Sequence, residues 1–197
     1  MGFFITTFLF SFLINGLFLK FSRTLGIRSN ESREIRWSAT TKPAFGGISF
    51  YIIFLLSFAC HAIFFQSNAI LDLRLIGLLA ACTLGFITGL ADDAYNTKPF
   101  LKFFAQVSCS IILIATGTYI NFFPWQGVNY VLTAFWVIGL MNSINMLDNM
   151  DGITTCVSIS VVLAAIFMLI TNSDYSNIHF IILIGVLSAL LGFLYFN

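Results

Sequence analysis

Long apolar blocks constrain this chain more than any other feature of its sequence. A bilayer crossing needs about 20 mostly apolar helical residues, and a helix satisfies every backbone polar group internally in hydrocarbon. We therefore expect an all-α, polytopic transmembrane helix bundle with about seven spans. The fifth is short, so we expect it either to borrow its flanks or to lie tilted. The predicted segments are Phe3–Leu19, Phe45–Phe65, Leu75–Ala91, Phe103–Tyr119, Tyr130–Met141, Thr154–Thr171 and Ile178–Phe196.

Composition supports the same class. Only 9% of the 197 residues are charged, against about 25% in an ordinary soluble domain. The net charge of +1 gives no reason to expect a nucleic-acid partner. The four cysteines each fall singly in apolar stretches, so we interpret them as packing residues. No linker, internal repeat or second domain is evident, and residues 1–197 are predicted to form a single transmembrane domain.

The few charges predict an orientation. Positive residues gather in cytoplasmic loops, and eight of the nine Lys and Arg residues fall on one face of the predicted topology, Arg74 being the exception. We therefore expect a multi-pass protein with its N-terminus outside. Half of the eight acids, the pairs Asp92–Asp93 and Asp148–Asp151, fall on the same cytoplasmic face.

The first acidic pair ends the third segment. Two adjacent carboxylates at a helix C-terminus face the negative end of the macrodipole and repel each other. Lys98, Lys102 or a divalent metal could compensate, because Mg²⁺ is commonly held by one or two carboxylates together with substrate phosphates. A solvated loop after a helix is the alternative interpretation.

The second polar cluster follows the fifth segment. Asn142, Asn145 and Asp148 are three residues apart and would lie along one side of a continuing helix. Asp151 and Gly152 are expected to end that helix, and Thr154 or Thr155 to cap the next. Such a cluster suits a metal–diphosphate or a sugar, although a polar helix end would look the same.

A third stretch, Lys42 to Gly47, follows a run of Arg and Lys residues. Pro43 and the pair Gly46–Gly47 interrupt the apolar pattern and leave backbone N–H groups near a helix start. Such a turn favours anions, while a basic loop that only sets topology is the alternative.

The ordered trio K-P-x-x-G-G, D-D with a lysine ten residues after the first Asp, and N-x-x-N-x-x-D-x-x-D-G resembles one family from about Gly26 to Asn197. It is similar to the polyprenyl-phosphate N-acetylhexosamine-1-phosphate transferases of glycosyltransferase family 4, whose relatives include the phospho-N-acetylmuramoyl-pentapeptide transferase of peptidoglycan synthesis. The resemblance implies transfer of a sugar-1-phosphate from a UDP-sugar to polyprenyl phosphate in the bacterial inner membrane. UMP is released, and Mg²⁺ is required, with Mn²⁺ as a conceivable substitute.

The resemblance also implies roles for residues at matching positions. Expected catalytic residues are Asp92, Asp93 and Asp151; expected substrate-binding residues are Lys42, Gly46, Gly47, Lys102, Asn142, Asn145 and Asp148; expected metal ligands are Asp92, Asp93, Asp148 and Asp151. Which aspartate is base and which is ligand stays open. So do the sugar donor, the oligomeric state (a homo-oligomer is allowed) and the choice among peptidoglycan, teichoic-acid, lipopolysaccharide O-antigen and capsule pathways.

Two departures from the family pattern matter. Asn149 stands where the family usually has Gly, and the chain stops at Gly192–Asn197, before a Gly-Asp-x-Gly-Ser loop and a His-containing loop. We therefore expect the N-terminal two-thirds of a longer enzyme of about ten spans. An inactive fragment or a membrane partner of an intact transferase is the alternative. A cation transporter is disfavoured, because the four key acids lie at span ends.

Overall fold

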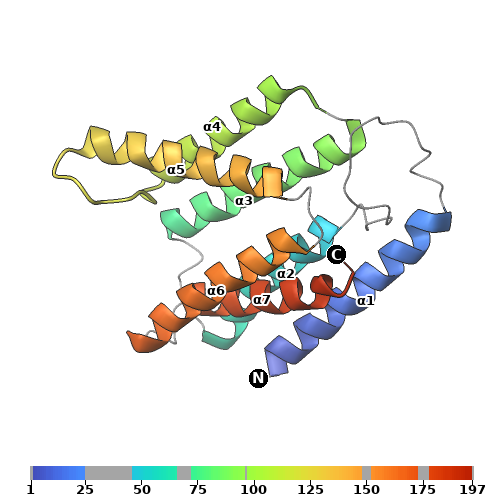
Figure 1. Cartoon of the computed structure of the whole chain (residues 1–197). Coiled ribbons are helices and arrows are strands. Elements are labelled where there is room, and N and C mark those ends of the chain that lie inside the picture. The colour runs from blue at the N-terminus through green and yellow to red at the C-terminus, as the bar shows by residue number, and fades with distance from the viewer. Residues whose placement is uncertain are drawn as a thin grey trace. The chain divides into compact units, whose positions relative to one another are not determined.

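The computed structural model describes residues 2–24, 46–65, 72–95, 97–147, 152–172 and 178–196. Within these ranges every element is a helix, and each predicted apolar segment corresponds to one of them, which confirms the all-α class (Figure 1). The helices are α1 (Gly2–Thr24), α2 (Gly46–Phe65), α3 (Leu73–Tyr95), α4 (Pro99–Ala115), α5 (Gln126–Leu147), α6 (Ile153–Thr171) and α7 (Ile178–Leu194).

Four of the described helices contain stretches long and apolar enough to cross a membrane: Gly2–Lys20, Leu73–Asp92, Gln126–Leu147 and Ile153–Thr171. The other three carry shorter apolar stretches, Gly47–His61, Pro99–Ala115 and Ile178–Leu194. The fifth segment does extend into its flanks, since α5 is 22 residues long and includes Asn142 and Asn145.

Several helices extend beyond their predicted apolar segments, and the boundaries of α4 and α6 have local explanations. Helix α4 lies four residues earlier than its apolar segment, because Pro99 occupies the first helical position and a left-handed Gly117 (φ +85°) follows its end. The Gly117 and Thr118 N–H groups donate to the carbonyls of Ile114 and Leu113, the pattern of a Schellman motif. Hydropathy alone carries neither signal.

The start of α6 corrects a second expectation. Neither Thr154 nor Thr155 caps this helix, because the helix already begins at Ile153. The N-cap residue is Gly152, which has φ +69° and provides no side-chain cap. The left-handed backbone of Gly152, a conformation that glycine adopts readily, therefore stands where a hydroxyl cap was expected.

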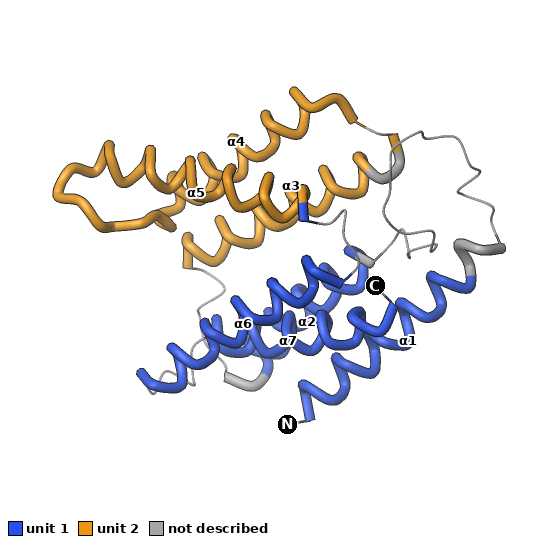
Figure 2. Tube along the Cα trace, in the orientation of Figure 1, with its two compact units in different colours: residues 1–66, 147–197 blue, residues 67–146 orange. Residues whose placement is uncertain are grey.

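The chain divides into two compact units, one of residues Met1–Gln66 and Leu147–Asn197 and the other of residues Ser67–Met146 (Figure 2). In the first unit α7 packs against α1, α2 and α6. Its buried face carries small residues, among them Gly185, Ser188, Ala189 and Gly192, which let helix backbones approach closely. Whether the two units act as one transmembrane domain stays a prediction.

Buried hydroxyl and amide groups link the helices of the first unit. Thr7 on α1 and Ser188 on α7 share a hydrogen bond of 2.6 Å between their hydroxyl oxygens. The Ser11 hydroxyl donates to the Ala189 carbonyl at 2.9 Å, and the Asn15 amide donates to the Ser49 hydroxyl of α2 at 3.0 Å. In an apolar medium such bonds hold helices together where burial of apolar surface cannot.

In the second unit α3 packs against α4 as an antiparallel pair. A Cβ at Gly77 would collide with Thr116, and the Cys109 thiol lies 3.5 Å from the Ala81 carbonyl oxygen. Helix α5 reaches α3 through Met141, whose Cε would lie 3.7 Å from a Cβ at Gly85. These contacts set the three helix ends that form the site described below.

Gly192→Ala should destabilise the first unit. The added Cβ would lie 2.9 Å from Ser11 Cβ and 3.0 Å from the Phe8 carbonyl oxygen, so α1 and α7 would have to separate. Overpacking of this kind costs about 1–3 kcal/mol. We expect a lower midpoint of thermal unfolding in detergent. Gly139→Ala on α5, where a Cβ meets nothing within 4 Å, is the matched control. Equal midpoints for the two variants would contradict the described packing.

Candidate active site

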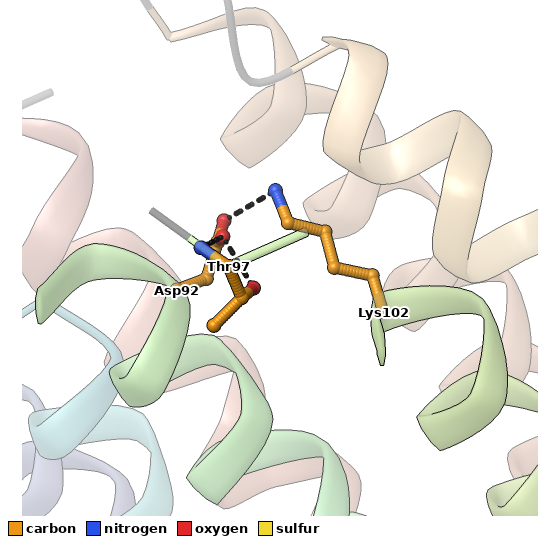
Figure 3. Close-up of polar contacts among 3 residues, drawn as sticks. All are labelled: Asp92, Thr97 and Lys102. Atoms are coloured by element: carbon orange, nitrogen blue, oxygen red, sulfur yellow. Dashed lines mark hydrogen bonds and ion pairs between the residues drawn. The ribbon is translucent and has the colours of Figure 1, made fainter. Parts of the chain in front are cut away.

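The Asp92 carboxylate stands in the last turn of α3 and is held on both of its oxygens (Figure 3). Oδ1 accepts a hydrogen bond from the Thr97 N–H at 3.1 Å and another from the Thr97 hydroxyl at 2.8 Å. Oδ2 forms an ion pair of 2.7 Å with the Lys102 ammonium. The compensating cation expected for this helix end is therefore Lys102.

The position of Asp92 joins two helix termini of opposite polarity. At the end of α3 the carboxylate faces the negative end of that helix's dipole. Through Thr97 it also reaches the start of α4, whose N-terminus favours anions. A partly exposed ion pair adds only about 0.2–1 kcal/mol of stability, and the Lys102 and Asp92 side chains are 30% and 26% exposed. The arrangement is thus better suited to presenting charge than to stabilising the fold.

These charged groups open onto a cavity of about 450 Å³ within the second unit. Its lining comes from the C-terminal turns of α3, the N-terminal turns of α4 and the C-terminal turns of α5. The lining residues are Gly85, Thr88, Gly89, Asp92, Pro99, Lys102, Phe103, Ala105, Gln106, Ile138, Met141, Asn142 and Asn145.

The charged residues of the cavity lie at one end of it. Asp92, Lys102 and Asn145 lie toward the helix termini, whereas Ile138 and Gly85 lie further along the helices. Two glycines one turn apart on α3 leave the space open, and a Cβ at Gly89 would meet nothing within 4 Å. The cavity can therefore receive a charged headgroup at the end near the helix termini.

The structure brings four of the predicted site residues together, namely Asp92, Lys102, Asn142 and Asn145. Gly46 and Gly47 are the first two residues of α2, in the other unit. The Asp93 side chain and the residues Lys42, Asp148 and Asp151 lie outside what the structure describes. Their proposed roles therefore rest on the sequence.

The oxygen atoms that line the cavity are of the type that a hard cation prefers. Mg²⁺ prefers oxygen ligands, and the cavity offers the Asp92 carboxylate with the Asn142 and Asn145 amides. Lys102 already balances the charge of Asp92. Among the described residues no three His, Cys, Asp or Glu side chains form a metal-binding group. Of the four predicted metal ligands, Asp92 is the one found in the described lining of this cavity.

Sequence reasoning missed three polar residues of this site: Thr97, Thr88 and Gln106. Thr88 is one helical turn before Asp92 and Gln106 is one turn after Lys102, so helical spacing alone could have placed both on the lining face. Thr97 gave a weaker signal, as a threonine two residues before a helix-starting proline. Its double hydrogen bond to Asp92 is evident only from the structure.

Comparison with known proteins assigns the family. The family model described as glycosyl transferase family 4 matches residues 75–197, more than half of the chain. The chain belongs to glycosyl transferase family 4. The matched region contains the whole lining of the cavity. With its apolar helices and its family, this family 4 chain is a multi-pass membrane protein.

Named relatives point the same way. A probable undecaprenyl-phosphate N-acetylglucosaminyl 1-phosphate transferase of Bacillus subtilis (strain 168) is 25% identical to this family 4 chain over 166 residues, covering 79% of the chain and 44% of the relative. The phospho-N-acetylmuramoyl-pentapeptide-transferase of Staphylococcus carnosus (strain TM300) is 28% identical over 203 residues, covering 91% and 60%. The chain thus spans about half the length of these relatives. No solved structure matches it.

Proposed function

We propose that this chain carries the acidic and lysine part of the active site of a polyprenyl-phosphate sugar-1-phosphate transferase. In the proposed reaction an oxygen of polyprenyl phosphate attacks the β-phosphorus of a UDP-sugar. The bond from that phosphorus to the bridging oxygen breaks, and UMP leaves with the electron pair. The product is a polyprenyl diphosphate sugar, with N-acetylhexosamine as the expected sugar.

The single observation that supports this proposal most is the shared cavity. Residues 50 positions apart in the chain, Asp92 and Asn142, line one cavity together with Lys102. Each comes from a motif that resembles the family. Both relatives named above are transferases, and the name of the Bacillus subtilis relative includes undecaprenyl phosphate. A transporter would need ionisable groups within the span, whereas Asp92 and Lys102 lie at helix ends.

The Asp92–Lys102 pair suits phosphate handling better than nucleophilic catalysis. Each Asp92 oxygen already accepts from a donor, which weakens the carboxylate as a nucleophile toward phosphorus but leaves it lone pairs for a metal ion. Its effect is to hold the Lys102 ammonium at the cavity, where that charge offsets the negative charge of a diphosphate. Direct attack by the lipid phosphate is therefore the mechanism that we favour.

The two amides of α5 would orient the soluble substrate. Asn142 and Asn145 are three residues apart on one helix face and line the cavity opposite the charged pair. An amide both donates and accepts hydrogen bonds, which fits the hydroxyl and acetamido groups of an N-acetylhexosamine. The apolar side of the cavity, with Ile138 and Phe103, would exclude water from the reacting phosphates.

Magnesium is part of the proposal. Asp92, Asp93, Asp148 and Asp151 are the proposed ligands, and Mn²⁺ is a conceivable substitute. A bound Mg²⁺ supplies charge neutralisation at the transferred phosphoryl group and its leaving oxygen. Lys102 contributes the protein's own share of that neutralisation.

The proposed setting is the bacterial inner membrane, with the cavity on the cytoplasmic side and the N-terminus outside. This orientation is supported by the position of Arg74, which lies beside Gly117 at the far end of α4 from Lys102. We further propose that the chain corresponds to the N-terminal part of a longer enzyme that starts cell-wall or surface-polysaccharide assembly. Lys42, Gly46 and Gly47 are proposed to contact phosphate in that enzyme.

Asp92→Asn should abolish transfer while leaving the protein folded. Asparagine keeps the shape but loses the charge that holds Lys102, so UMP release from UDP-N-acetylglucosamine, polyprenyl phosphate and Mg²⁺ should fall by about 100-fold or more in membranes, the scale of losing one transition-state contact. Asp72→Asn is the matched control. Asp72 is an exposed acid before the same helix, and asparagine can still accept from the Arg74 N–H as Asp72 Oδ1 does at 3.0 Å.

The outcomes separate the alternatives. Full activity of Asp92→Asn would refute the proposed site. Absence of UMP release from the parent chain, despite membrane insertion, would favour the inactive fragment. Release only when an intact transferase is added would favour the membrane partner.

Thr97 should act as a positioning residue for Asp92. Thr97→Ala removes the hydroxyl bond to Oδ1 and lets the carboxylate rotate away from Lys102, and loss of a residue that orients a site side chain typically costs about 10- to 100-fold in activity. Thr97→Ser retains the hydroxyl and should restore most of the rate. Equal losses in both variants would mean that the threonine methyl group, and so local packing, is what matters.

A further inference from the structure

The connection between α4 and α5 is an apolar loop that carries no charge. It covers residues 116–125, and no Asp, Glu, Lys, Arg or His occurs anywhere from residue 103 to residue 147. Loops that lie in water between membrane helices normally contain charged residues. The loop lies at the opposite end of α4 from Lys102, and it is drawn in yellow-green between the two helices in Figure 1.

Two buried side chains of α5 fasten this loop. Asn129 and Thr133 are only 1% and 4% exposed. Asn129 Oδ1 accepts from the N–H groups of Phe122 and Phe123 at 3.2 and 2.8 Å, and its amide donates to the Phe123 carbonyl at 2.8 Å. The Thr133 hydroxyl oxygen accepts from the Ile120 N–H at 2.9 Å.

Several backbone N–H groups of the loop therefore have hydrogen-bond partners within the protein and do not need water. Its N–H groups at Ile120, Phe122 and Phe123 have side-chain partners, and Pro124 has no N–H at all. Non-helical backbone near hydrocarbon is tolerated only when its polar groups are satisfied within the protein.

The same loop presents large apolar side chains outward. Phe122 is 77% exposed and Trp125 is 76% exposed. The exposed surface continues along α5 through Val131 and Phe135, on the side away from Asn129 and Thr133. The helix thus buries its polar residues against the loop and exposes apolar ones, the reverse of a helix in water.

We propose that this loop is a membrane-interface anchor, with Phe122, Phe123 and Trp125 inserted at the boundary between phospholipid headgroups and acyl chains. Tryptophan and tyrosine favour this depth because each combines an apolar ring with a polar group. Tyr119 packs edge-on against Tyr130 beside the loop, with ring centroids 5.1 Å apart. Arg74 lies next to Gly117 and is placed to meet lipid phosphate.

Lipid is favoured over a protein partner by the chemistry of the loop. Three backbone N–H groups of the loop already have partners within the protein, and residues 116–125 carry no charge, so the loop offers a protein partner no ion pair. The inference does not depend on the proposed transferase function, because the loop lies at the other end of the second unit from the cavity.

Depth-dependent fluorescence quenching tests this anchor. The chain has three tryptophans, so Trp37→Phe with Trp136→Phe leaves Trp125 as the reporter, and Trp37→Phe with Trp125→Phe leaves Trp136. Trp136 lies 11 residues further along, about 16 Å deeper at 1.5 Å per helical residue. Each protein is reconstituted in phosphatidylcholine vesicles with bromine atoms placed either near the headgroup or near the acyl-chain ends.

Trp125 should lose most fluorescence to bromines near the headgroup, and Trp136 to the deeper bromines. Iodide in the water should quench neither. Asn129→Ala in the Trp125 reporter should release the loop, shift its emission to the red and admit iodide, while the exposed-site control Gln126→Ala should not.

Two results would overturn the proposal. Quenching of Trp125 by iodide and not by brominated lipid would place the loop in water. Protection of Trp125 from both quenchers, while Trp136 is quenched by lipid, would mean that a second copy or another protein covers the loop.

Discussion

The scarcity of water as a hydrogen-bond partner is the constraint on which this structure depends. In each unit a buried polar side chain links two segments whose alignment apolar packing alone would not fix. Asn15 connects α1 to α2 in the first unit, and Asn129 fastens the α4–α5 loop in the second. The close approach of α1 and α7 at Gly192 meets the same need, because it lets the Ser11 hydroxyl reach the Ala189 carbonyl.

The candidate active site departs from that rule where chemistry requires it. At the ends of α3, α4 and α5 the polar groups are only partly shielded, and Asp92 and Lys102 satisfy each other while remaining open to a ligand. The pair adds little stability, and its position at the cavity is in keeping with the phosphate binding proposed above.

Much of this fold could be predicted from the sequence, because lipid imposes helices on long apolar segments. The location of every described helix followed from hydropathy, and helical spacing placed Asn142 and Asn145 on one face. Boundaries governed by backbone conformation could not be found that way: Gly117 ends α4 early and Gly152 replaces the expected threonine cap of α6.

For the site, charge patterning indicated that a cation should accompany Asp92, and the structure selects Lys102 for that role. The contact between Thr97 and Asp92 could not be predicted, because a hydrogen bond from a hydroxyl to a carboxylate five residues earlier depends on the geometry of one turn. The fastening of the loop by Asn129 escaped for the same reason. Such contacts join residues whose contact does not follow from helical spacing, so no sequence pattern predicts them.

Protection of a cysteine in the cavity by a nucleotide sugar tests the central claim most directly. In a chain whose four native cysteines are replaced by alanine, Ala105→Cys introduces a thiol on the cavity lining, and Gln126→Cys introduces one at the opposite end of the unit. We expect UDP-N-acetylglucosamine with Mg²⁺ to slow maleimide labelling of Cys at 105 and not at 126, and Asp92→Asn to abolish the protection. Unchanged labelling at position 105 in a chain that still releases UMP would contradict the assignment of this cavity as the active site.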